Sequence, residues 1–237
     1  MKKPMKIATL TAVLLAGVVA AAQAAPTAGE MQRLRDAAAV LNSMHGAETS
    51  IPQNIWNKAD CVIVIPGLKK AAFGFGGEYG KGVMTCRRGS ENEWSAPSFV
   101  RLEKGSWGFQ IGAEETDLVL MVMNRTGMDK LLQDKVSLGA GASVAAGPVG
   151  RTANAATDAQ MSAEILSYSR SHGLFAGIDI SGGVLGPDTE ANANLYGQEI
   201  AAKRILADAA VPTPSDARPF ITAVKGEYPV ATTGRGR

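Results

Sequence analysis

The 237-residue chain has little of the chemistry that metal binding and nucleophilic catalysis require. It holds only two histidines, His45 and His172, and two cysteines, Cys61 and Cys86, and none of the four has a partner at metal-ligand spacing. A zinc site is therefore not expected. Ser171 and His172 are neighbours in one predicted turn, and adjacent residues there do not place a hydroxyl and an imidazole as nucleophile and base. We therefore expect a protein that is not an enzyme and has no metal.

The chain also lacks an excess of positive charge. It has 24 Lys and Arg against 22 Asp and Glu, and removing the three lysines of residues 1–24 leaves 21 against 22. A nucleic-acid partner usually requires a basic face, so none is expected. The charges are distributed unevenly, because residues 61–104 carry seven basic and four acidic side chains whereas residues 114–190 carry five and ten.

Long apolar runs are confined to the N-terminus. Residues 1–24 combine Lys2, Lys3 and Lys6 with an apolar run of about 16 residues and a small-x-small end, which predicts a signal peptide cleaved after Ala24. The alternative is a membrane anchor, but no basic stop-transfer flank follows. We therefore expect an exported protein, periplasmic or secreted, with one domain over residues 25–210 and a flexible tail over 211–237. In an oxidising compartment the even cysteine count favours a Cys61–Cys86 disulfide over two separate buried thiols.

Hydrophobic periodicity predicts a helix, many strands and a closing helix. Helices are expected at residues 29–43, 128–133 and 191–210, and strands at 61–65, 71–77, 82–87, 98–102, 107–112 and 118–123. Turns are expected at 77–81, 104–105 and 114–117, and a last hairpin joins 163–169 to 174–185. This order predicts an α+β fold with an antiparallel, strongly curved or barrel-like, glycine-rich sheet flanked by N- and C-terminal helices.

The stretch GLKKAAFGFGGEYGKG, residues 67–82, contains six glycines. It does not fit a phosphate-binding loop, because Gly80-Lys81 is followed by Gly82 rather than Ser or Thr, and the dinucleotide pattern has Tyr79 where its last glycine belongs. No cofactor is therefore expected, and the glycines suit tight corners and close strand contacts. The rings and lysines between them suit a membrane interface, unless the rings are core and the lysines are an ordinary solvated rim.

Seven phrases in this order resemble the SYLF domain, a lipid-binding module. They are ADCVIVIPGLKK (59–70), GGEYGKGV (76–83), WSAPSF (94–99), GFQIG (108–112), GPVGR (147–151), YSRSHGLFAG (168–177) and NLYG (194–197). The resemblance covers residues 38–210.

The resemblance implies a binding module without catalytic residues, which associates with anionic phospholipid membrane surfaces through basic side chains. Mapped onto this sequence, the lipid-binding residues would be Lys69, Lys70, Lys58, Lys81, Arg87, Arg88, Arg101 and Lys104. The alternative is a structural or adaptor protein of the cell envelope that binds a protein partner.

Overall fold

The computed structural model describes residues 25–44, 51–73, 75–89, 93–107, 112–149, 162–171, 174–208 and 210–226. The predicted signal peptide and its cleavage site therefore lie outside the described residues. The elements, in chain order, are α1 (Ala28–Met44), α2 (Gln53–Lys58), β1 (Cys61–Phe73), β2 (Phe75–Arg88), β3 (Glu93–Trp94), β4 (Ser98–Trp107), β5 (Gly112–Val122), α3 (Arg125–Leu131), β6 (Val136–Ser137), β7 (Val144–Ala146), β8 (Ile165–Ser171), β9 (Leu174–Gly177), β10 (Val184–Pro187), α5 (Thr189–Tyr196), α6 (Ala202–Ala207), a 3₁₀ turn (Ser215–Ala217) and α7 (Arg218–Lys225).

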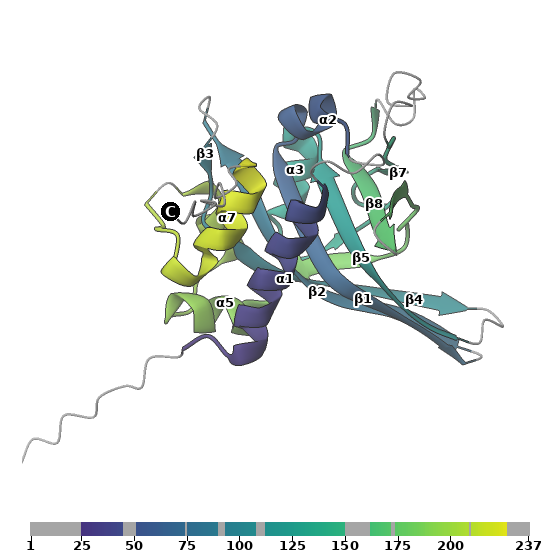
Figure 1. Ribbon diagram of the computed structural model, residues 1–237, viewed down its shortest axis with the longest axis horizontal. Coiled ribbons are helices and arrows are strands. Elements are labelled where there is room, and N and C mark those ends of the chain that lie inside the picture. Colours follow the sequence, from purple (N-terminus) through teal and green to yellow (C-terminus); the bar gives the residue numbers. More distant parts are fainter. Residues whose placement is uncertain are drawn as a thin grey trace, which may run out of the picture.

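The strands form one open, strongly curled sheet with helices packed against it (Figure 1). Its order is β6-β10-β4-β2-β1-β5-β8-β7, with β3 added to β2 and β9 added to β8. Every pairing between these named strands is antiparallel except that of β7 with β8. The predicted α+β class with a curved sheet is confirmed, and the sheet is mixed because of this one parallel pair. Within the described ranges, no helix combines the length and the apolar character needed to cross a membrane.

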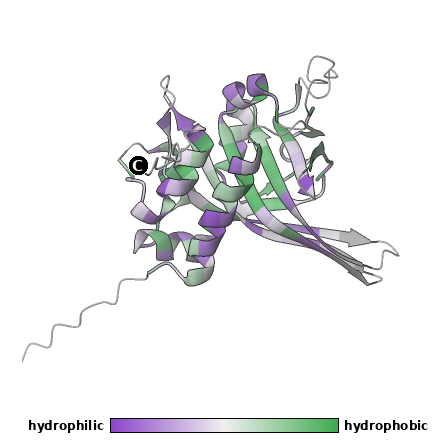
Figure 2. Cartoon of the chain, viewed as in Figure 1, coloured by the Kyte–Doolittle hydropathy of each residue, from purple (hydrophilic) through white to green (hydrophobic). Residues whose placement is uncertain are grey.

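Each face of the sheet buries its own apolar cluster, because successive side chains of a strand point to opposite faces. We call these the α1 face and the α3 face. On the α1 face, α1 and α7 pack over the strands through Leu34, Leu41, Phe220 and Val224 against Val62, Val64, Phe99 and Val119. On the α3 face, Met128 and Leu131 pack with Ile63, Ile65, Leu102, Leu118 and Leu120. Figure 2 shows these apolar strand segments beneath the helices.

Strands β1, β2, β4 and β5 continue beyond the helices as an arm (Figure 1). We define the arm as residues 69–73, 75–79, 103–107 and 112–115. Strand β10 pairs with β4 only as far as Glu103, and β8 pairs with β5 only from Asp117. Among the described residues, the arm strands beyond these points therefore pair only with one another. Five residues of extended chain give the arm a length of about 16 Å.

The arm leaves the body at a bulge in β1. The register of β1 shifts against β2 between Val64 and Lys69, and against β5 between Ile65 and Leu68. Gly67 lies in this bulge with a φ of 58°, a conformation that costs other residues free energy. Its N–H donates to the Asp117 carboxylate at 3.0 Å, so the bulge is tied to the neighbouring strand.

Glycines in β2 let this strand pack closely on the bulged strand. A Cβ on Gly82 would overlap the Val64 carbonyl oxygen and lie 2.6 Å from Ile65 Cγ1, and one on Gly80 would lie 2.8 Å from Leu68 Cδ1. A Cβ on Gly77, in the arm, would meet nothing closer than the Lys104 carbonyl oxygen at 3.5 Å. The glycine-rich stretch is therefore a pair of strands with close backbone contact, as one interpretation of the sequence proposed.

Three predicted turns are wrong. Residues 77–81 lie inside β2, 104–105 inside β4 and 114–117 inside β5, because the strands are longer than their apolar segments. Strands β1 and β2 instead meet at the pair Phe73 and Phe75. Of the predicted strand 107–112, residues 108–111 lie outside the described residues.

The C-terminal helices also differ from the prediction. The single helix expected at 191–210 is two, α5 and α6, because Gly197 ends α5 with a φ of 68°. Residues 218–225, which the sequence analysis assigned to the tail, form α7, and its Phe220 and Val224 are fully buried on the α1 face. The part of the predicted tail from residue 227 lies outside the described residues.

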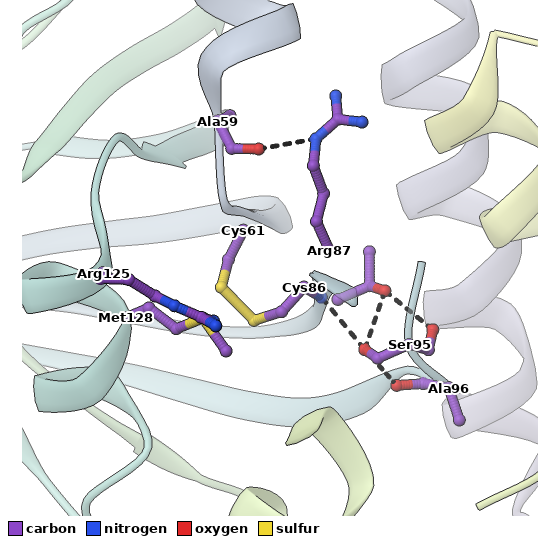
Figure 3. Close-up of a disulfide and its surroundings, with 9 residues drawn as sticks. Ala59, Cys61, Cys86, Arg87, Ser95, Ala96, Arg125 and Met128 are labelled. Carbon is purple, nitrogen blue, oxygen red and sulfur yellow. Dashed lines mark hydrogen bonds between the residues drawn. A yellow bond between two sulfur atoms is a disulfide. The ribbon is translucent and has the colours of Figure 1, made fainter. Parts of the chain in front are cut away.

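The predicted disulfide is confirmed. Cys61 and Cys86 are direct partners in the β1–β2 pairing and are bonded in the structure. Both are fully buried in the cluster on the α3 face, and Figure 3 shows Met128 of α3 nearby. The Cys86 N–H donates to Ser95 Oγ at 3.0 Å, which ties the bonded strand to β3 and the following loop.

Candidate functional site

The eight cations predicted to bind lipid do not gather in one place. Lys58, Arg87 and Arg88 lie near the Cys61 end of the sheet, opposite the arm, where Figure 1 shows α2. Arg87 Nε donates to the Ala59 carbonyl at 2.9 Å (Figure 3), and its guanidinium lies 4.4 Å from the centre of the Trp94 ring. Burial lowers the pKa of the Arg87 guanidinium from its ordinary value. These contacts give Arg87 a structural role at this end of the sheet.

The remaining five cations divide between the two faces. Lys69, Lys81 and Arg101 lie on the α1 face, because Lys69 and Lys81 line a cavity with α1 and Arg101 lies between two residues of the opposite cluster. Lys70 and Lys104 lie on the α3 face, where Lys104 Nζ is 3.8 Å from Glu78 Oε1. Lys69 and Lys70 are consecutive in a strand, so they point to opposite sides.

Acidic side chains interleave with the lysines of the arm. One cross-strand row reads Glu115, Lys69, Tyr79 and Glu103, and the next reads Glu114, Lys70, Glu78 and Lys104. The arm therefore holds three lysines and four glutamates. Its formal charge does not favour an anionic surface, in contrast to the basic patch that the sequence predicted.

The free end of the arm brings three aromatic residues into register. Phe73 pairs with Phe75, and Phe75 pairs with Trp107 on β4. These residues are the ends of β1, β2 and β4, and Figure 1 shows this end of the arm projecting away from the helices. The sequence analysis noted Phe73 and Phe75, but it placed Trp107 in a different strand, so it did not associate the three.

A cavity of about 660 Å³ lies where the arm joins the body, between α1 and the α1 face. Its lining includes Arg33 and Asp36 of α1, the Pro66-Gly67 bulge, Lys69, Tyr79, Lys81, Glu115, Asp117 and Arg170. Two phrases of the sequence that carry the family resemblance, PGLKK and GEYGKG, thus meet in one cavity. We call it the root cavity.

Part of the charge in the root cavity is already paired. Arg33 Nη1 and Lys81 Nζ lie 3.6 Å and 3.0 Å from the same oxygen, Oδ2 of the buried Asp188. Burial lowers the pKa of the Arg33 guanidinium, and Asp188 opposes this shift. On the other wall, Arg170 Nη1 lies 3.0 Å from Asp117 Oδ2. These pairs join α1, β2, β5, β8 and the start of α5.

Lys69 and Glu115 are the exception. They are direct cross-strand partners and both are exposed, yet within the described part of the chain neither side chain makes a hydrogen bond or an ion pair. The Glu115 carboxylate instead lies over Gly67, where its Oε1 is 2.5 Å from the position that a Cβ would take. Tyr79, the partner of Lys69 on its other side, is 46% exposed.

The described residues offer no cluster of metal ligands. No group of three or more His, Cys, Asp or Glu within them could hold a metal ion. Glu114, Glu115 and Asp117, which the sequence placed in one acidic turn, lie in β5, where Glu114 points away from the other two. His172 lies outside the described residues. Asp179 accepts hydrogen bonds from the N–H and hydroxyl of Ser181 and closes a local turn.

A family model described as Ysc84, Las17-binding protein actin regulator, matches residues 103–227 of this chain. Among curated proteins, the chain is 35% identical over 177 residues to LAS seventeen-binding protein 3 of Saccharomyces cerevisiae, covering 73% of this chain and 38% of that protein. It is 34% identical over 168 residues to Protein YSC84 of the same yeast, covering 70% and 36%. It is 31% identical over 167 residues to the human SH3 domain-containing YSC84-like protein 1, covering 70% and 48%. The chain thus spans less than half the length of these relatives.

Proposed function

The chain belongs to the Ysc84 (SYLF) family, and from this premise we propose that it is a non-catalytic binding module that docks on a lipid surface through the end of its arm. The observation that carries the proposal is the register of Phe73, Phe75 and Trp107 at the free end of the arm. Aromatic residues favour the boundary between water and hydrocarbon, and a projecting end can reach that boundary before the helices meet the surface.

Lysines behind the aromatic end would add to this contact. Lys70 and Lys104 occur in one row, three residues behind Phe73 and Trp107, or about 10 Å along the strand. Long lysine side chains can extend along apolar surface toward phosphate groups, and each contributes about 1 kcal/mol near an anionic leaflet. The glutamates of the arm offset much of the attraction between these lysines and an anionic leaflet. We therefore assign the larger share of the binding free energy to the aromatic residues. Of the predicted lipid-binding residues, Lys70 and Lys104 are thus the ones this proposal retains in a supporting role.

Co-sedimentation with vesicles tests the proposal. If each ring contributes about 1.5 kcal/mol, the low end for burying an aromatic side chain, replacing Phe73, Phe75 and Trp107 with serine weakens partitioning by about three orders of magnitude. Replacing Lys70 and Lys104 with glutamine is the matched control and should weaken partitioning by at most about thirtyfold, and on anionic vesicles only. Unchanged sedimentation of the triple serine variant would refute docking through this end.

Salt dependence separates this mechanism from attraction by a basic patch. Screening shortens electrostatic attraction to about 8 Å at physiological ionic strength. An arm with three lysines and four glutamates should therefore lose little affinity for vesicles as salt rises. A steep loss with salt would instead favour the basic surface that the sequence predicted.

A protein partner is the second candidate, because the yeast relative is named as a LAS seventeen-binding protein. The two candidates differ in one measurement: purified chain binds protein-free vesicles only if the lipid proposal holds. Export through residues 1–24, and hence a periplasmic or secreted location with association at a membrane surface, remains part of the lipid proposal.

A further inference from the structure

We propose that the root cavity is a binding site for a small zwitterion that carries a phosphate and an ammonium group, the chemistry of a phosphoethanolamine head group. This inference deepens the proposed function, since it names a lipid chemistry, and it rests on a different part of the molecule from the aromatic end of the arm. It is carried by the two opposite charges, Lys69 and Glu115, that face the cavity without partners.

The charged groups of Lys69 and Glu115 are separated from each other. Opposite charges at directly paired positions of an antiparallel sheet have Cβ atoms about 5 Å apart and commonly form an ion pair. Lys69 and Glu115 occupy such positions, yet no ion pair within 4.0 Å joins them. The positive φ of Gly67 and its missing Cβ leave room for the Glu115 carboxylate above the bulge. The bulge thus leaves space in which the carboxylate lies apart from the ammonium group.

The residues beside Lys69 and Glu115 suit the two charged groups of such a ligand. Lys69 would bind the phosphate group of the ligand, and Lys81 lines the same cavity. The positive charge of Lys81 is only partly offset, because Lys81 shares Asp188 with Arg33. Next to Lys69, Tyr79 is 46% exposed and lines the cavity, and an aromatic ring is a favourable partner for an ammonium group. Glu115 supplies the carboxylate for the same group. Asp117 is already occupied by Arg170 and the Gly67 N–H.

The charges around the root cavity are balanced. Its lining holds four cations, Arg33, Lys69, Lys81 and Arg170, and three carboxylates, Asp36, Glu115 and Asp117, with Asp188 beside them. A site of balanced charge gains little from a simple anion or a simple cation. A ligand that carries both charges can satisfy Lys69 and Glu115 together, and a volume of about 660 Å³ is within the range of small-molecule sites.

Titration of the purified chain with three soluble probes tests the site. Glycerophosphoethanolamine carries both charges, whereas glycerol 3-phosphate and ethanolamine carry one kind each. We expect nuclear magnetic resonance shifts at Lys69, Tyr79 and Glu115 with glycerophosphoethanolamine, and at least about fivefold weaker binding of the other two probes. Equal binding of glycerol 3-phosphate would overturn the zwitterion assignment, and no shifts with any probe would overturn the site.

A neighbouring residue on the opposite face provides a matched control. Lys69→Gln and Glu115→Gln should each weaken glycerophosphoethanolamine binding by about fivefold, whereas Glu114→Gln should leave it unchanged. Glu115→Gln should also tighten glycerol 3-phosphate binding, because it removes a repulsive charge. This gain is an effect that general destabilisation cannot produce. An equal effect of Glu114→Gln and Glu115→Gln would contradict the proposal.

Vesicles distinguish the two sources of this ligand chemistry and the two proposals. If the ligand is a lipid head group, vesicles with phosphatidylethanolamine should bind the chain more tightly than vesicles of equal charge without it, and Glu115→Gln should remove the difference. If the soluble probe binds but the vesicles do not discriminate, the ligand is a free zwitterion. The triple serine variant at Phe73, Phe75 and Trp107 should lose vesicle binding and keep the soluble probe, so failure of one proposal leaves the other measurable.

Discussion

Replacing Gly82 with alanine tests whether the glycines of β2 serve packing. The new Cβ would overlap the Val64 carbonyl oxygen and lie 2.6 Å from Ile65 Cγ1 and 3.1 Å from Ile65 Cα. Two of these three atoms belong to the backbone of β1, which is held between β2 and β5 and cannot move aside easily. Overpacking of a well-packed core typically costs about 1–3 kcal/mol.

For a domain of this size, that cost lowers the midpoint of thermal unfolding by about 2–12 °C. Circular dichroism or scanning calorimetry would measure it. Gly77→Ala is the control, since its Cβ would meet only the Lys104 carbonyl oxygen at 3.5 Å, and its midpoint should change by about 1 °C or less. If both variants have the same midpoint of thermal unfolding as the native chain, close packing does not require the glycine at position 82. Our explanation of the glycine-rich stretch would then be refuted.

Two further predictions concern covalent and electrostatic stability. Replacing both Cys61 and Cys86 with serine opens a loop with a sequence separation of 25 residues and should lower the free energy of unfolding by about 3.5 kcal/mol. Urea titration against the oxidised native chain measures this difference, and coincident unfolding curves would contradict the prediction. Hydrogen bonds from Lys130, with help from Ser143, lower the pKa of Glu164 below its ordinary value, so its contribution to stability is present above about pH 4.5 and is lost as the pH falls through the folded-state value. The stability difference between the native chain and Glu164→Gln should therefore shrink on acidification below that pH, whereas a constant difference across the titration would show that this carboxylate is not linked to folding.

The sequence predicted the centre of the sheet well, because burial there leaves a clear pattern. Residues 61–65 form an unbroken apolar run and lie in β1, fully buried. The cysteine pairing was expected from the count and the compartment, and the structure adds its geometric cause: positions 61 and 86 are opposite each other in the β1–β2 register.

Predictions failed where one residue type serves more than one purpose. Gly77 and Gly80 were interpreted as turn residues, yet they lie in β2, and Gly80 is there because a side chain would collide with β1. A single sequence cannot distinguish a glycine that forms a turn from one that allows a neighbouring strand to pack closely, since both appear only as glycine. The distinction depends on where the partner strand bulges.

The C-terminal helix was missed for a different reason. Pro212, Pro214 and Pro219 suggested an irregular tail, but proline is compatible with the first turn of a helix, and Pro219 lies in the first turn of α7. The spacing of Phe220 and Val224, four residues apart, was a signal that could have identified the buried face.

The charges show most clearly what the linear sequence conceals. Lys69 and Lys70 look like one basic cluster, but a strand sends them to opposite faces, and the register then places Glu115 beside the first and Glu114 beside the second. A cluster of cations in an extended segment therefore creates a basic patch only if the neighbouring strands add no acids at the paired positions. Here they do, and the same pairing that cancels the patch leaves Lys69 and Glu115 as separate, opposite charges at the mouth of a cavity. Selectivity of this chain should accordingly follow the arrangement of charge within a ligand rather than the ligand's net charge.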